Sequence, residues 1–201
     1  MNTIIVINPV TENIFLKKDE NLTYIAIFKN TTAEPRKLDF NFTQENSKLT
    51  FLSFIIGENI DTLNLETNSV HNAQNTTAHY FLNAIQSGKS TVNYTGNLKI
   101  SKNAQKTDSY LSHKTLLLSD DAKTTTIPSL EIKADDVKAG HSATISSLDS
   151  EQLFYLKSRG LSEDESKHIL KEGFIKELLE KIIDINAKEQ VVLSLWKSLK
   201  I

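Results

Sequence analysis

The chain has 201 residues, of which 39% are hydrophobic, and a formal net charge of -2 at pH 7. This length and composition predict a globular protein that buries a proper core, with one domain or one domain and an appendage. The near-neutral charge argues against a nucleic-acid partner, and the absence of cysteine excludes disulfides, thiolate catalysis and any zinc or iron–sulfur site built only from the chain's own thiolates.

The first apolar run, residues 4–7, is far too short to cross a membrane, and no positive residue precedes it as in a signal peptide. We therefore expect a cytoplasmic protein with no membrane partner. Asn-x-Thr sequons occur at Asn21, Asn30, Asn41, Asn75 and Asn93. In a protein that is not exported, they are interpreted as turn and strand chemistry.

Residues 4–148 are predicted to form β-strands. Short runs in this region alternate apolar and polar residues, and Asn, Gly, Asp and Lys separate the runs; examples are residues 23–28, 38–42, 62–66 and 97–100. Alternation with a period of two is the pattern of strands. Many short strands at regular spacing fit a sandwich, a barrel or a solenoid, and the Asn-rich corners without two-residue hairpin turns favour a β-solenoid.

After Leu148 the pattern changes to that of helices. Asp149 to Gln152 and Ser162 to Glu165 each resemble a capping box, and Gly160 stands where a left-handed helix cap is wanted. The apolar residues expected on helix faces are Leu153, Phe154, Leu156, Ile169, Leu170, Phe174, Leu178, Ile182, Ile183, Val191, Val192, Leu195, Trp196 and Leu199. We divide the chain into a β core, residues 1–148, and a helical region, residues 149–201.

Two neighbouring motifs resemble a known family. The segment Leu130-Glu-Ile-x-Ala-Asp-Asp-Val-Lys-x-x-His-x-Ala-Thr144, followed by Glu151-Gln-Leu-Phe-Tyr-Leu-x-Ser-Arg-Gly160, is similar to the C-terminal signature of the SufB/SufD family, in particular its SufD branch. This family supplies scaffold subunits of the SUF iron–sulfur cluster assembly complex. The resemblance is strong from about residue 96 to residue 174 and looser back to about residue 22.

The resemblance implies a mainly β protein: a right-handed β-helix followed by a C-terminal α-helical region. It also implies a non-catalytic scaffold subunit whose β-helix pairs with SufB and whose helices dock the SufC ATPase. Two departures from the family pattern are expected to matter. The chain lacks the helical N-terminal region of longer members, and Ala139 stands where many members carry a cysteine.

His141 is the residue to which the resemblance gives a chemical role. Strict alternation from Val137 to Ile145 places His141 on the inward side, and from the residues alone a core histidine satisfied by a backbone carbonyl is the preferred interpretation. The resemblance instead aligns His141 with the family's histidine at the SufB–SufD interface. It implies that His141 binds a nascent iron–sulfur cluster together with a SufB cysteine, and that no cofactor is bound permanently.

Other polar residues receive structural interpretations. Asp135 and Asp136 are expected in a turn rather than as a chelating pair. Arg159 is suited to a helix C-terminus, while the resemblance implies that Tyr155, Arg159, Gly160 and Phe174 contact SufC.

Two functional hypotheses remain at this point. In the first, the chain is a scaffold that contributes His141 to a composite assembly site. In the second, it is only a structural or regulatory platform for SufC, with His141 buried and inert. An exposed solenoid end also invites pairing, so a homodimer of the isolated chain is expected where SufB would otherwise bind.

Overall fold

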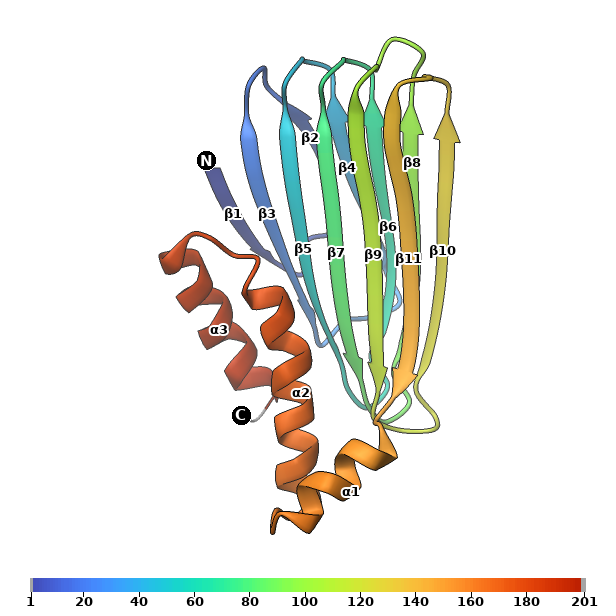
Figure 1. Ribbon diagram of the computed structural model, residues 1–201. Helices are drawn as coiled ribbons and strands as arrows, with labels where there is room; N and C mark the ends of the chain where they lie inside the picture. Colours follow the sequence, from blue (N-terminus) through green and yellow to red (C-terminus); the bar gives the residue numbers. More distant parts are fainter. Residues whose placement is uncertain (1, 200–201) are drawn as a thin grey trace.

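The structure, a computed structural model, describes residues 2–199, in which eleven strands precede three helices (Figure 1). The strands are β1 (Asn2–Ile7), β2 (Thr11–Leu16), β3 (Asn21–Lys29), β4 (Pro35–Phe42), β5 (Lys48–Gly57), β6 (Thr62–His71), β7 (Thr77–Gln86), β8 (Thr91–Ile100), β9 (Thr107–Leu117), β10 (Lys123–Ile132) and β11 (Val137–Ser147). The helices are α1 (Ser150–Ser158), α2 (Glu163–Leu179) and α3 (Ile185–Leu199).

The strands form two parallel sheets. Sheet A has the order β1-β3-β5-β7-β9-β11, and sheet B has the order β10-β8-β6-β4-β2. Successive strands therefore alternate between the sheets, and every strand pairing is parallel. This arrangement is a solenoid of about five turns, which confirms the predicted β-helix and excludes the antiparallel sandwich.

The corners of the solenoid explain the many asparagines. Positive φ angles occur at Asn30, Asn46, Asn59 and Asn75, and asparagine tolerates this left-handed conformation because its short side chain bonds locally. The Nδ2 atom of Asn46 also donates to Oδ1 of Asp19 on the preceding turn, 27 residues earlier and 2.8 Å away. Asparagine thus both bends the chain and links adjacent turns.

The main core fills the space between the sheets. Tyr24, Phe40, Phe51 and Tyr80 form an aromatic stack with neighbouring ring centroids 5.4 to 5.9 Å apart. Rings at these separations gain from edge and stacked contacts as well as from burial. The stack is contributed by both sheets, so it holds them together.

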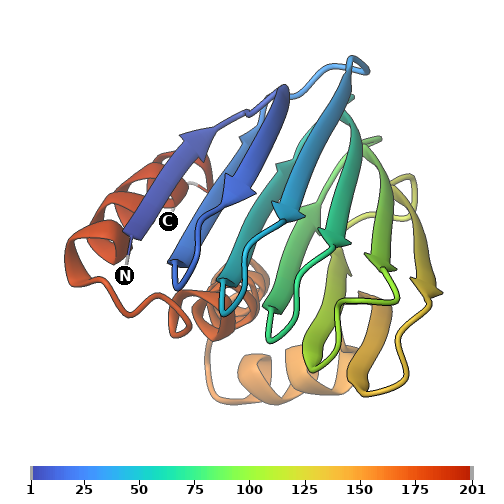
Figure 2. The same ribbon diagram turned by 90° about the horizontal axis from the view of Figure 1, so that it is seen from above.

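A second core lies between the outer face of sheet A and the helices. Ile25, Ile27 and Phe54 of the sheet pack with Ile175 of α2 and Val191 of α3. The helices cover the part of sheet A near β1 to β7 and leave sheet B uncovered (Figures 1 and 2).

The helix faces differ in part from the prediction. Leu178 and Ile182 are buried as expected, but Ile169 and Ile183 are exposed, and the buried Ile175 was missed. The helix α2 ends at Leu179, so a continuous stripe through residue 183 was wrong. The side chain of Leu199 lies outside the described residues.

The predicted apolar face of α1 is also corrected. None of its residues is buried, and Phe154 is 75% exposed. The reason is that α1 packs against α2 beyond the C-terminal ends of β9 and β11, where neither sheet covers it (Figure 1).

Candidate functional site

The last turn of the solenoid, β10 and β11, is here called the open end. Each of these strands is the final member of its sheet, so within the described residues 2–199 one edge of its backbone has no neighbouring strand. Apolar side chains on the inner side are consequently exposed: Leu130 is 37%, Ile132 40% and Ile145 48% accessible. Unpaired strand edges beside exposed apolar side chains are suited to strand pairing with another chain.

His141 lies on β11 at this open end. Its backbone is in register with Leu111 of β9, whose side chain belongs to the main core. Alternation therefore assigned the correct side of the sheet, but His141 is exposed because no further turn covers it. The interpretation as a buried core histidine is wrong.

The surroundings of His141 leave its ring accessible. Ala139 and Ala143 flank it on the same side of the strand, and among the side chains that the structure describes, those of residues 2–196, no hydrogen bond or ion pair to its imidazole is found. Within the same part of the chain, no group of three or more His, Asp or Glu residues could hold a metal ion. Asp135 and Asp136 lie in the bend between β10 and β11, as predicted.

A second histidine, which the sequence analysis left unassigned, lies beneath the open end. His113 of β9 is 1% exposed, and its Nδ1 atom is 2.7 Å from Oγ1 of Thr126 on β10. Burial lowers the pKa of His113 to about 4, so the ring is neutral near pH 7. Alternation along β9 from Leu111 would have placed His113 on the inner side.

The turn between α1 and α2 carries most of the residues expected to contact SufC. Gly160 has a φ of +94°, and the amides of Gly160 and Leu161 donate to the carbonyl oxygens of Lys157 and Leu156 at 3.0 and 3.4 Å. These two bonds define a Schellman cap, so the predicted left-handed cap is confirmed. The capping box of Ser162 and Glu165 is also present.

Tyr155 and Arg159 lie together on the surface beside this cap. The guanidinium carbon of Arg159 is 5.1 Å from the ring centroid of Tyr155, within the range of a cation–π contact. Both side chains are exposed, and exposed aromatic and arginine side chains are common anchors in protein interfaces.

Phe174 is placed differently from the other three. Its side chain is partly buried against the second core, and its carbonyl oxygen accepts a 3.0 Å hydrogen bond from Nδ2 of Asn83. Phe174 lines a hollow of about 610 Å³ between α1, α2 and the end of β11. A neighbouring hollow, lined by Tyr155, shares Gln152 and Ile169 with it.

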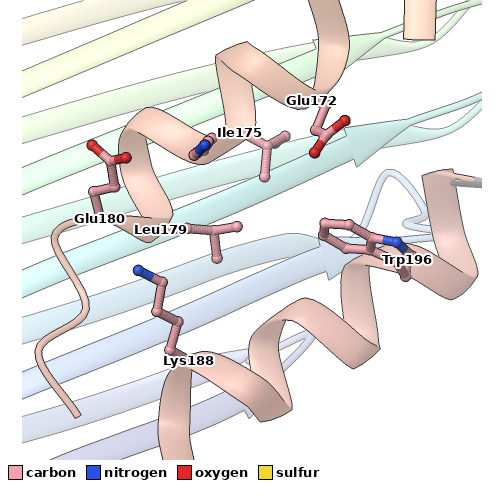
Figure 3. Close-up of a pocket in the computed structure, with 7 residues that line it drawn as sticks. Glu172, Ile175, Leu179, Glu180, Lys188 and Trp196 are labelled. Atoms are coloured by element: carbon pink, nitrogen blue, oxygen red, sulfur yellow. The ribbon is translucent and has the colours of Figure 1, made fainter. Parts of the chain in front are cut away.

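A smaller pocket of about 200 Å³ lies between α2 and α3. Figure 3 shows Ile175 and Leu179 of α2 facing Trp196 of α3, with charged side chains at the rim. None of the residues predicted to act in a functional site lies in this pocket. Among the described residues, no helix is both long and apolar enough to span a lipid bilayer.

Comparison with known proteins gives a consistent result. The family model described as "SUF system FeS cluster assembly, SufBD core domain" matches residues 5–174. The chain is 33% identical over 148 residues to the iron–sulfur cluster assembly protein SufD of Escherichia coli, an alignment that covers 74% of this chain and 35% of that protein.

Two further relatives are iron–sulfur cluster assembly SufBD family proteins. One from Synechocystis is 39% identical over 44% of this chain and 20% of its own length. One from Mycobacterium leprae is 33% identical over 56% of this chain and 13% of its own length. The matched part of the chain thus corresponds to about a third or less of these curated relatives.

Proposed function

The chain belongs to the SufBD core-domain family of the SUF iron–sulfur cluster assembly system, and we propose that it acts there as a non-catalytic scaffold subunit. Its open end pairs with SufB, and its C-terminal helices dock the SufC ATPase. The nascent cluster is cargo of this assembly rather than a resident cofactor.

The observation that carries this proposal is the exposed imidazole of His141 on an unpaired edge strand. A neutral imidazole is a suitable ligand for iron, but one nitrogen ligand does not hold a cluster. The chain contains no cysteine, so the thiolates must come from another polypeptide. A strand that such a polypeptide added to the edge of β11 would lie next to His141.

SufC docking is supported by the surface at the α1–α2 turn. Tyr155 and Arg159 present an aromatic ring and a cation next to each other, and the cap at Gly160 fixes the direction of the turn. Phe174 contributes through the neighbouring hollow, where its partly buried ring supports the packing of α2.

The experiment compares complexes of SufB, SufC and this chain purified together without oxygen. We expect His141→Ala to leave the amounts of SufB and SufC that co-purify unchanged and to abolish iron and sulfide loading. The matched control is His168→Ala on α2, away from the open end, which keeps normal loading. Normal loading of the His141→Ala complex would contradict the ligand role. The chain would then be a structural or regulatory platform for SufC that contributes no ligand to the cluster.

A further inference from the structure

We propose that the hydroxyl of Thr126, held by the buried ring of His113, is a hydrogen-bonding partner for the ligand that His141 binds at the open end. This inference rests on the proposed function, because it concerns the same composite site. Thr126 and His113 are positioning residues in it: they orient the bound group and do not ligate iron.

The first step of the argument is the position of Thr126. Its backbone is in register with Tyr94 of β8, whose side chain is in the main core, so Thr126 faces the inside of the solenoid. Since β10 is the last strand of sheet B, no further turn covers Thr126, and it is partly exposed. Its hydroxyl therefore borders the open end from the sheet opposite to His141.

The second step is the link between the two sheets. The Nδ1 atom of His113 in sheet A and Oγ1 of Thr126 in sheet B are 2.7 Å apart, so this bond crosses the interior directly below the open end. His113 is in register with Ala143, two residues along β11 from His141. Parallel strands lie about 4.8 Å apart and rise about 3.3 Å per residue, so the Cα atoms of His113 and His141 are about 8 Å apart, and both side chains are on the inner side.

The third step is the chemistry of the pair. A neutral imidazole exists in two tautomers, one that accepts the Thr126 proton at Nδ1 and one that donates its own proton to Oγ1. In the first the Thr126 oxygen offers lone pairs to a ligand, and in the second its hydroxyl proton is free to donate to sulfide or to a metal-bound group. The His113–Thr126 pair can thus bind either a ligand that donates a hydrogen bond or one that accepts it, and it stays uncharged in both cases.

The interior below the pair supports this orientation. The hydroxyls of Tyr94 and Thr67 are 2.7 Å apart, and the ring of Tyr94 meets His113 edge-on with centroids 5.1 Å apart. The His113 ring is thereby held between Tyr94 and Thr126. Removing an outer group that orients a metal-binding site in this way commonly lowers the affinity for the metal by 10–100-fold.

The test uses the complex with SufB and SufC, loaded without oxygen with ferrous iron and sodium sulfide. We expect Thr126→Val to cause roughly tenfold faster loss of the cluster and a shift in its visible absorption bands, while Thr126→Ser restores both. Thr125→Val is the matched control, because Thr125 is the adjacent residue on the outer face of sheet B, and it should behave as the unchanged chain.

If Thr126→Val acted only by lowering stability, another destabilising variant should have the same effect, so Phe54→Leu serves as a second control. It removes buried apolar contacts in the second core between sheet A and the helices, and we expect it to keep the normal spectrum. The inference is overturned if Thr126→Val retains the normal spectrum and cluster lifetime while His141→Ala abolishes loading. Normal loading of His141→Ala would instead contradict the proposed function itself.

Discussion

His71 and His113 are both buried inside the solenoid, and their contacts show how the fold accommodates an ionisable ring. His71 stacks on Phe42 with centroids 4.1 Å apart, and its two ring nitrogens lie 2.9 Å from Oγ of Ser69 and 2.7 Å from Oγ1 of Thr76. Burial lowers the pKa of His71 to about 3 and that of His113 to about 4. Both rings are therefore accommodated only as neutral groups.

This arrangement predicts that stability falls in mild acid. In the unfolded chain a histidine has a pKa near 6.5. Below that pH, His71 and His113 therefore bind protons in the unfolded state while they stay neutral in the folded state. The free energy of unfolding should decrease as the pH falls from about 6.5 to about 4, by about 1.4 kcal/mol per pH unit for each histidine.

Urea unfolding of the isolated chain at several pH values measures this slope. His71→Asn and His113→Asn should each remove one histidine's share of this slope. An identical slope for His71→Asn and the unchanged chain would show that His71 does not resist protonation in the folded state.

Residue-level prediction from the sequence was accurate for side-chain direction and inaccurate for exposure. Alternation placed His141 on the inner side of β11, and the register with Leu111 agrees. Its exposure depends on whether another turn follows, which is a property of the whole solenoid. The hydrogen bond between His113 and Thr126 could not be predicted, because Thr126 lies on β10, a strand of the opposite sheet, and no local pattern in β9 contains that information.

At the scale of elements, local capping signals were the most reliable part of the sequence. The cap at Gly160 and the capping box at Ser162 use atoms within a few residues of each other, so no tertiary contact is needed to predict them. The helix faces were less predictable, because α2 ends at Leu179 and rests on sheet A along Ile175 and Leu178. That orientation is fixed by packing partners far away in the sequence.

Two glycines provide a paired prediction on these helices. A Cβ atom added at Gly160 or Gly173 would meet no atom within 4 Å, so any effect of alanine comes from the backbone. Gly160 has a φ of +94°, and alanine there should cost about 1 kcal/mol or more. Gly173 is inside α2, where alanine should stabilise by about 0.5–1 kcal/mol.

Hydrogen exchange by mass spectrometry separates the two effects. Gly160→Ala should speed exchange of the α1 amides by roughly fivefold or more and weaken capture of SufC, and Gly173→Ala should slow exchange in α2. Unchanged exchange in α1 together with unchanged SufC capture would show that neither the helix nor the docking surface depends on the left-handed cap.

At the scale of the molecule, the sequence favoured a solenoid but did not reveal the length of its repeat. Short strands and Asn-rich corners favoured it, while the period was not recognised because turns differ in length. Residues bonded across adjacent turns are 27 apart near the beginning and 31 apart near the end. The left-handed positions at Asn30, Asn59 and Gly88 recur at this spacing, and such a ladder of turn residues is the signal that a search for repeats would use.

The open end also predicts how the isolated chain behaves in solution. The edges of β10 and β11, with 10 and 11 residues, offer more unpaired backbone than β1 and β2 at the other end, with 6 residues each. We expect two copies to pair through their open ends, because this covers the exposed Ile132 and Ile145 and satisfies the strand edges.

Sedimentation equilibrium of the isolated chain should therefore detect a dimer. Ile145→Lys should shift the equilibrium toward monomer by at least tenfold, because pairing would bury its charge at an apolar contact without a partner. Ile4→Lys is the matched control at the opposite end: Ile4 is in register with the inward-facing Tyr24 and is 42% exposed, close to the 48% of Ile145. A dimer that Ile4→Lys dissociates and Ile145→Lys preserves would place self-association at β1 and β2, and the open end would then lose its main support as a pairing surface.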